Sequence, residues 1–169
     1  NIPLKQNIFD FAYNYGKEMG YEVTASAFDV ESLMFLMQYE IPFIKIANNR
    51  KLDYLVNLIP KDIPVYISNN QECEGVSFNC NMFCVSKYPA DITDYEKLKL
   101  FEGCNISDHT DDFELYHKYK PRIIEWHYKL PYSTGLDAGS FARTPEQLKN
   151  ILGTEEYNYD NNLNSIKVK

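Results

Sequence analysis

Apolar and polar residues alternate along this chain with two periods, and the period changes from one segment to the next. Between residues 4 and 19 the apolar positions recur every three or four residues, which predicts an amphipathic helix that Gly20 ends. Residues 21–25 have the pattern of a strand. Asp29 is a suitable N-cap for a second helix over residues 30–39.

The rest of the chain continues this alternation. Further strands are expected over residues 41–47, 64–68, 81–86, 104–107 and 122–128. Helices are expected over residues 51–58, 94–101 and 111–118, and a last helix begins at Thr144-Pro145-Glu146 and stops at Gly153. Repeated strand–helix units indicate a parallel sheet covered by helices. The expected fold is therefore α/β: a TIM-barrel-like parallel sheet with helices outside and about six of the eight βα units.

Length and composition fit one packed domain. The chain has 169 residues, of which 44% are hydrophobic, and we expect a partial (β/α) barrel domain over residues 1–153 and a polar C-terminal tail over residues 154–169. An open sheet of six strands exposes two edges, so we expect a homo-oligomer partner or an additional chain segment to complete the barrel. The chain has neither an initiator Met nor a signal peptide, so we expect it to begin inside a longer reading frame or after processing.

Charge and cysteine usage exclude several classes of function. The net charge is −7 and the pI is near 5.0, so no nucleic-acid partner is expected. No apolar run approaches the roughly 20 residues that a membrane span needs, so no membrane partner is expected either. The cysteines form no C-x-x-C pair and read as the reduced thiols of a cytoplasmic protein: Cys73, Cys80, Cys84 and Cys104.

Polar side chains end nearly every predicted strand. These residues are Ser26, Lys45, Ser68, Ser86, Ser107 with His109, and Glu125 with His127. In α/β folds ligands bind at the carboxyl ends of the strands, where hydroxyls and a Lys suit a phosphate or a carboxylate. His109 and His127 follow consecutive strands, where two imidazoles can share one divalent metal ion. The alternative is that each Ser or His only caps its own strand, through a hydrogen bond to the backbone.

Lys45 is a charged residue inside an apolar strand. It alternates with Ile44 and Ile46 and therefore points to the opposite face of the sheet. A Lys directed into a barrel must be paired or lose its charge. Its expected partner is a bound phosphate or carboxylate, and the alternative is an ion pair with Glu125 or Asp108.

A series of short motifs follows in order along the chain. They are Thr24-Ala25-Ser26-Ala27-Phe28-Asp29, Lys45-Ile46-Ala47, Cys84-Val85-Ser86-Lys87-Tyr88-Pro89, Ser107-Asp108-His109-Thr110, Glu125-Trp126-His127-Tyr128, Gly135-Leu136-Asp137 and Thr144-Pro145-Glu146-Gln147-Leu148. This series resembles the barrel of the N-acetylneuraminate (sialic acid) synthase family, from the third strand of that barrel up to about Leu152. The Ser-Asp-His-Thr and Ser-x-Tyr-Pro segments are the specific ones.

The resemblance implies an enzyme. The family condenses phosphoenolpyruvate with N-acetylmannosamine or a related amino-sugar aldehyde, with a divalent metal, Mn²⁺ or Mg²⁺. The resemblance implies that His109 and His127 hold the metal, and that the catalytic residues are Lys45, His109, His127 and Asp137. The residues implied to bind the substrates, phosphoenolpyruvate and a small sugar, are Ser26, Lys45, Asn48, Ser68, Ser86 and Ser107.

The chain also departs from the family pattern. The first two barrel strands, with a Glu and a Lys of the site, and the C-terminal antifreeze-like domain have no counterpart here. Arg50 stands where the family has a Glu that binds the sugar, and Phe83 stands where it has a His. The phosphate and metal sides of the site are thus retained while the sugar side is altered. A non-catalytic, degenerate barrel that acts as a binding or structural module is therefore the alternative to a phosphoenolpyruvate-dependent synthase.

Overall fold

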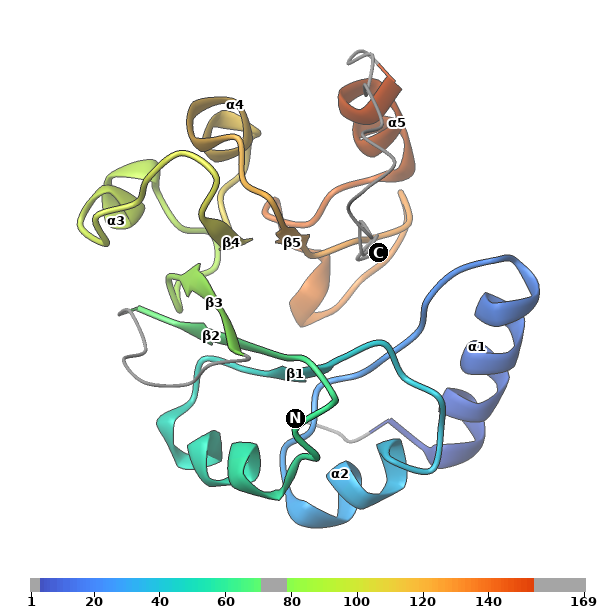
Figure 1. The fold of residues 1–169 in the computed structure, drawn as a ribbon. Helices are drawn as coiled ribbons and strands as arrows, with labels where there is room; N and C mark the ends of the chain where they lie inside the picture. The colour runs from blue at the N-terminus through green and yellow to red at the C-terminus, as the bar shows by residue number, and fades with distance from the viewer. Residues whose placement is uncertain (1–3, 71–78, 154–169) are drawn as a thin grey trace. The chain divides into compact units, whose positions relative to one another are not determined.

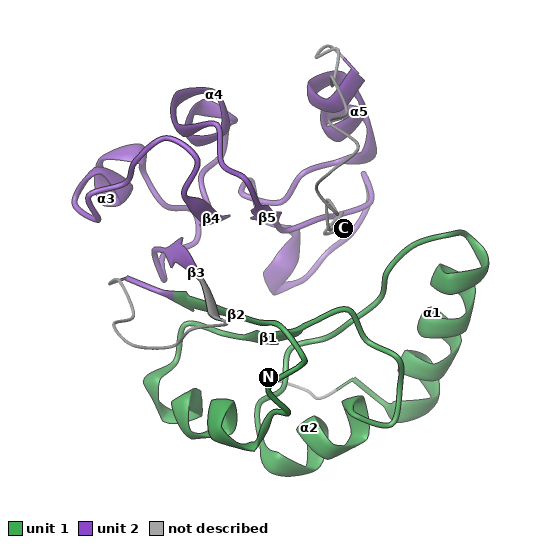
Figure 2. Ribbon diagram, in the orientation of Figure 1, with its two compact units in different colours: residues 1–68, 74–80 green, residues 69–73, 81–169 purple. Residues whose placement is uncertain are grey.

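The computed structural model describes residues 4–70 and 79–153, which lie in two compact units (Figures 1 and 2). Unit 1 comprises residues 1–68 and 74–80, and unit 2 comprises residues 69–73 and 81–169. Strands and helices alternate in both units, and every assigned strand pair is parallel. The α/β, TIM-barrel-like class expected from the sequence is confirmed. The expected tail over residues 154–169 lies outside the described residues.

Unit 1 places three helices around two parallel strands. Its elements are α1 (Gln6–Glu18), α2 (Val30–Leu36), β1 (Ile44–Ile46), the 3-10 helix η1 (Arg50–Leu58) and β2 (Val65–Asn69). The start of α2 confirms the predicted cap, because the Asp29 carboxylate accepts from the Ser32 amide while the Ser32 hydroxyl accepts from the Asp29 amide. Gly20, at φ +77°, follows the end of α1 in the left-handed conformation that glycine tolerates best.

The register of β1 and β2 separates an apolar face from a polar one. Ile44 pairs with Val65 and Ile46 pairs with Ile67, and these four residues belong to a core formed with α2 and η1. Lys45 pairs with Tyr66 on the opposite face. Both strands are buried throughout, as is typical of parallel sheets covered on both faces.

The strand predicted for residues 21–25 is reduced to one isolated bridge, between Ser26 and Lys45. The Thr24 hydroxyl donates to the Phe43 carbonyl at 2.7 Å, so this segment follows β1 without forming a ladder with it. The described residues therefore contain five strands, where the sequence predicted six.

The apolar residues between positions 4 and 19 whose spacing predicted α1 do not form the buried face of that helix. Phe9 is the buried residue of this helix, and its ring packs edge-on against Phe35 and Tyr39. The residues of that spacing stay exposed among the described part of the chain: Leu4, Ile8, Phe11, Tyr15 and Met19. The helical period was predicted correctly, whereas the aromatic cluster determines which side of the helix faces the core.

Unit 2 contains three parallel strands in sequence order with helices after them. Its elements are residues 81–84 of β3 (Asn79–Cys84), α3 (Ile92–Glu96), β4 (Asn105–Asp108), α4 (Glu114–Tyr119), β5 (Ile124–Trp126), the 3-10 turn η2 (Leu136–Ala138) and α5 (Pro145–Gly153). Its core consists of Phe83, Ala90, Tyr95, Cys104, Ile106 and Leu115. The predicted start of α5 is confirmed, since the Thr144 hydroxyl accepts from the Gln147 amide and the Gln147 side chain accepts from the Thr144 amide.

Two further expectations concern thiols and membranes. Cys84 and Cys104 are buried thiols, while Cys73 and the side chain of Cys80 lie outside the described part of the chain. No helix within residues 4–70 and 79–153 combines the length and the apolar character that a membrane crossing requires.

Candidate functional site

The two histidines follow neighbouring strands of unit 2. The strands β4 and β5 are parallel, with Ser107 opposite Glu125 and Asp108 opposite Trp126. His109 and His127 each come one residue after the end of their strand, so alternation places them on the face of Ser107 and Glu125. Their ring centroids are 5.1 Å apart. The structure thus brings the two predicted metal ligands side by side.

His109 is held by hydrogen bonds in one tautomer. Its Nδ1 lies 2.6 Å from the carbonyl oxygen of Val85, and because that oxygen can only accept, Nδ1 carries the proton. Burial lowers the pKa of His109, and the neighbouring His127 lowers it further, against the raising effect of the Val85 carbonyl. The imidazole is therefore neutral at pH 7. Its Nε2, 3.4 Å from the Ser107 hydroxyl, carries the lone pair that can bind a metal or accept a proton.

His127 faces the loop after β5. Its Nδ1 is 3.4 Å from a carboxylate oxygen of Asp137, which lies in η2 and is exposed. A carboxylate at this distance orients an imidazole, as carboxylates do for metal-binding histidines. The structure therefore brings together a further predicted pair of the site, His127 and Asp137.

Two aromatic rings enclose the histidine pair. Tyr88 packs against His109 at 4.1 Å between centroids and edge-on against His127 at 5.6 Å. Phe141 packs edge-on against both Tyr88 and His127, at 5.2 and 5.0 Å. Burial raises the pKa of Tyr88 to about 12, with the nearby carboxyl groups of Glu125 and Asp137 acting in the same direction, so its hydroxyl keeps its proton at neutral pH.

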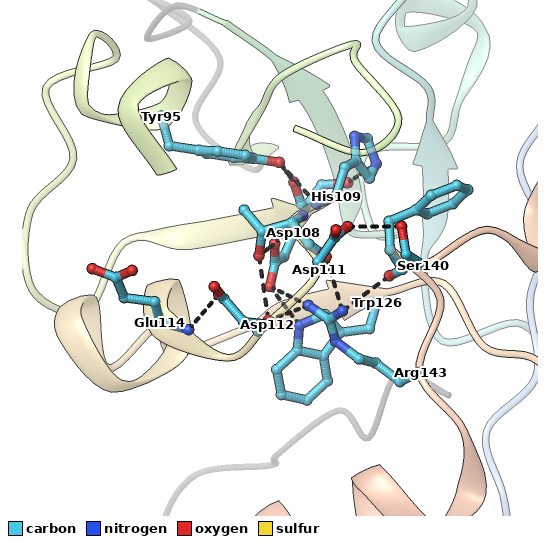
Figure 3. Close-up of polar contacts among 12 residues, drawn as sticks. Tyr95, Asp108, His109, Asp111, Asp112, Glu114, Trp126, Ser140 and Arg143 are labelled. Atoms are coloured by element: carbon cyan, nitrogen blue, oxygen red, sulfur yellow. Dashed lines mark hydrogen bonds and ion pairs between the residues drawn. The ribbon is translucent and has the colours of Figure 1, made fainter. Parts of the chain in front are cut away.

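Tyr95 of α3 fixes the end of β4 from the helix side. Its hydroxyl donates to the Ser107 carbonyl at 2.6 Å and accepts from the His109 amide at 3.0 Å (Figure 3). The side chain is fully buried, and burial raises its pKa well above the usual range of a phenol. Tyr95 therefore bridges the two backbone groups on either side of Asp108, a role that sequence reasoning missed.

A polar network lies on the opposite face of β4 and β5. The Asp108 carboxylate accepts from the indole nitrogen of Trp126 at 2.7 Å, from the Thr110 amide at 2.8 Å and from Arg143 at 3.2 Å (Figure 3). Trp126 also packs against the rings of Phe113 and Tyr116, on the face opposite the histidines.

The predicted anion-binding residues of unit 1 meet in part. Lys45 and Ser68 are buried, and the Lys45 ammonium donates to the Ser68 hydroxyl at 2.8 Å. Ser26 is half-buried and forms the backbone bridge to Lys45. Asn48 is half-buried, two residues beyond β1. A buried ammonium beside a hydroxyl is a pair of donors that suits a phosphate or carboxylate oxygen.

Ser86 and Arg50 lie in exposed positions. Ser86 follows β3 by two residues. Arg50, which replaces the acidic residue of the family pattern, begins η1 and forms an exposed ion pair with Asp53 at 3.2 Å. Within residues 4–70 and 79–153, no three His, Cys, Asp or Glu side chains gather closely enough to hold a metal ion by themselves.

Comparison with solved structures finds a similar fold. The chain superposes on the crystal structure of N-acetylneuraminic acid (sialic acid) synthetase from Leptospira borgpetersenii serovar Hardjo-bovis, determined in complex with citrate, with a TM-score of 0.69. The match covers 89% of this chain at 21% identity, and this chain spans 61% of that protein's chain. Comparison of the sequence with protein families gives no match, and comparison with curated proteins gives none. At this identity the likeness establishes the fold.

Proposed function

We propose that this chain carries the barrel part of a sialic-acid-synthase-like enzyme. The proposed reaction condenses phosphoenolpyruvate with an amino-sugar aldehyde such as N-acetylmannosamine. A bond forms between C3 of phosphoenolpyruvate and the aldehyde carbon, water adds at C2, and inorganic phosphate leaves. The observation that carries the proposal is the pairing of His109 and His127, 5.1 Å apart at the ends of adjacent parallel strands.

The residues present fit a divalent metal ion. Zinc and related ions bind the neutral imidazole, and the Val85 carbonyl keeps His109 in the tautomer whose Nε2 is available. His109 and His127 would hold the ion, which we propose is Mn²⁺ or alternatively Mg²⁺. Water or substrate oxygens would complete its coordination. When bound, the metal supplies Lewis acidity that polarises the sugar aldehyde.

The chain's own donors would hold the anionic substrate. We assign the phosphate and carboxylate of phosphoenolpyruvate to Lys45 and Ser68, which already form a buried donor pair, and a further hydroxyl contact to Ser26. Charged hydrogen bonds of this kind offset the charge on the substrate as the new bond forms. The Asp137 carboxylate would orient His127. The neighbour of similar fold is a sialic acid synthetase whose structure was determined in complex with citrate, a carboxylate.

The decisive experiment separates ligand binding from turnover. Thermal unfolding is followed with Mn²⁺ alone, phosphoenolpyruvate alone and both together, because a ligand that binds the native state raises the melting temperature. We expect phosphoenolpyruvate with Mn²⁺ to give the largest rise. Phosphate release with N-acetylmannosamine then measures the reaction. A rise without phosphate release would favour the binding module, and no rise at millimolar phosphoenolpyruvate would refute both the substrate and the synthase.

A further inference from the structure

Arg143 is a fully buried arginine at the end of the long loop that follows β5. Its guanidinium reaches the turn after β4, where it donates to the Thr110 carbonyl at 2.8 Å, to the Asp108 carboxylate at 3.2 Å and to the Asp112 carbonyl (Figure 3). This side chain therefore binds the residue directly before His109 and the residue directly after it.

The backbone of the same residue binds the other histidine. The Arg143 amide donates to the His127 carbonyl at 2.7 Å, and the Arg143 carbonyl accepts from the Lys129 amide at 2.9 Å. These bonds surround a parallel bridge between Tyr128 and Arg143. One residue thus holds the chain at both histidines, through its side chain on the β4 side and through its backbone on the β5 side.

Arg143 also anchors the loop that lines the histidine pair. Its guanidinium donates to the Phe141 carbonyl at 3.2 Å, and the Phe141 ring packs on His127. The Ser140 hydroxyl donates to Asp111 at 3.0 Å, which ties the loop to the turn after β4 a second time. Asp137, which lies near the His127 imidazole, belongs to the same loop.

We propose that Arg143 is a positioning residue that sets the distance and orientation of His109 and His127. As a statement about catalysis it rests on the proposed function, whereas as a statement about geometry it stands on these contacts alone. The guanidinium is planar and offers five donors, which lets it bind two carbonyls and a carboxylate around one turn. A lysine donates from a single nitrogen atom and cannot reproduce this arrangement.

Histidine NMR spectra test the geometry without any ligand. The chain has three histidines, and His117 on α4 is exposed and serves as the internal reference. In Arg143→Met and Arg143→Lys we expect the ring signals of His109 and His127 to shift and the cross-peak between the Phe141 ring and His127 to disappear, while His117 keeps its signal. Leu115→Ala truncates a fully buried residue of the same unit and is the control for general destabilisation.

Two results of the NMR experiment would contradict a positioning role for Arg143. Unchanged His109 and His127 signals in a folded Arg143 variant, or equal shifts in Leu115→Ala, would overturn the proposal. If neither Arg143 variant folds, Asp108→Asn decides by the same criterion, because it removes the negative charge that the guanidinium meets and keeps the arginine.

A metal titration then links the geometry to the proposed site. Where the wild type binds Co²⁺, we expect Arg143→Lys to weaken that binding by about 10–100-fold, as losses of residues that orient metal ligands do, while Leu115→Ala leaves it unchanged. Equal Co²⁺ affinity in Arg143→Lys and wild type would refute the positioning role at the metal. If the wild type binds no Co²⁺, the metal part of the proposed function fails, while the NMR result still decides the role of Arg143 in the geometry.

Discussion

The Asp108 carboxylate and the Arg143 guanidinium form an ion pair, with Oδ2 and Nη2 3.2 Å apart, and neither side chain is exposed to solvent. The two residues are 35 positions apart in the sequence. Each side chain also forms hydrogen bonds with neutral groups, but these bonds do not supply an opposite charge. A buried pair of this kind costs desolvation to form, but removal of one partner leaves the other charge uncompensated in the core.

The first prediction follows from this asymmetry. Arg143→Met or Asp108→Asn is expected to lower the free energy of unfolding by about 3–5 kcal/mol, measured by urea denaturation. The double variant is expected to lose less than the sum, because the two residues interact directly.

The exposed pair Arg50–Asp53 is the matched control for that prediction, because it has the same separation of 3.2 Å. Arg50→Met is expected to cost less than about 1 kcal/mol, since water already solvates both of its charges. Equal losses for Arg50→Met and Arg143→Met would show that burial of the Asp108–Arg143 pair contributes nothing.

Local signals in the sequence determined most elements of the fold. The Asp29 and Thr144 caps, the Gly20 stop and the apolar strands are each determined within a few neighbouring residues, and the structure has them where the patterns placed them. The strand predicted at residues 21–25 failed because a strand exists only through its partner. Here the segment is connected to β1 and the residue before it by one backbone bridge and one side-chain hydrogen bond only.

The residues of the candidate site likewise fall into those that local sequence patterns predict and those that they do not. His109 and His127 could be paired from the sequence because adjacent parallel strands bring their carboxyl ends together. Tyr95 and Arg143 could not be predicted, because each reaches the site from another element, 14 and 35 residues away, and no local pattern encodes such a contact. The one local signal for Arg143 is a charged residue directly after the apolar pair Phe141-Ala142.

A second prediction concerns the Tyr95 hydroxyl. Tyr95→Phe removes the donor to the Ser107 carbonyl and the acceptor of the His109 amide, and leaves both backbone groups buried without this partner. The expected loss in the free energy of unfolding is about 1–3 kcal/mol. Tyr13→Phe is the control, because the Tyr13 hydroxyl donates to the Glu40 carbonyl at an exposed site. If the two variants lose the same free energy, the Tyr95 bridge is no more important than a surface hydrogen bond.

The third prediction is a dependence of stability on pH. The pKa of His109 in the folded protein lies below its ordinary value of 6.5, chiefly because burial disfavours the imidazolium. Between that lowered pKa and 6.5 the unfolded chain therefore binds a proton that the native chain does not. The His109 contribution is fully present above pH 6.5 and is lost as the pH falls toward the lowered pKa.

Denaturation curves in the presence of a chelator, from pH 7 down to about pH 5, measure this dependence. We expect His109→Gln to reduce the slope of stability against pH in this range. His117→Gln, at an exposed position, is expected to keep the wild-type slope. The explanation is wrong if His109→Gln retains the full slope.

A fourth prediction tests the proposed metal site. His109→Ala and His127→Ala are each expected to abolish Mn²⁺ binding in calorimetry, since either change leaves one imidazole where two are needed. His117→Ala is expected to bind Mn²⁺ like the wild type. Unchanged Mn²⁺ affinity in His109→Ala would remove this pair as the metal site, while the hydrogen bond from His109 to Val85 would remain as a structural contact.

The last prediction concerns the buried ammonium of Lys45. Because the buried Lys45 donates to Ser68 on the polar face of β1 and β2, an anion bound there gains a charged and a neutral donor together. Phosphoenolpyruvate at about 100 times its dissociation constant should stabilise the wild type by about 2.7 kcal/mol, seen as a rise in melting temperature. Lys45→Met is expected to erase this rise while it leaves the ligand-free protein folded, because the methionine fills the space of the lysine stem. Lys51→Met, at an exposed position of η1, is the control and should keep the full rise. A rise in melting temperature that is retained in Lys45→Met would exclude the Lys45–Ser68 pair as the anion site, because this variant lacks the Lys45 ammonium.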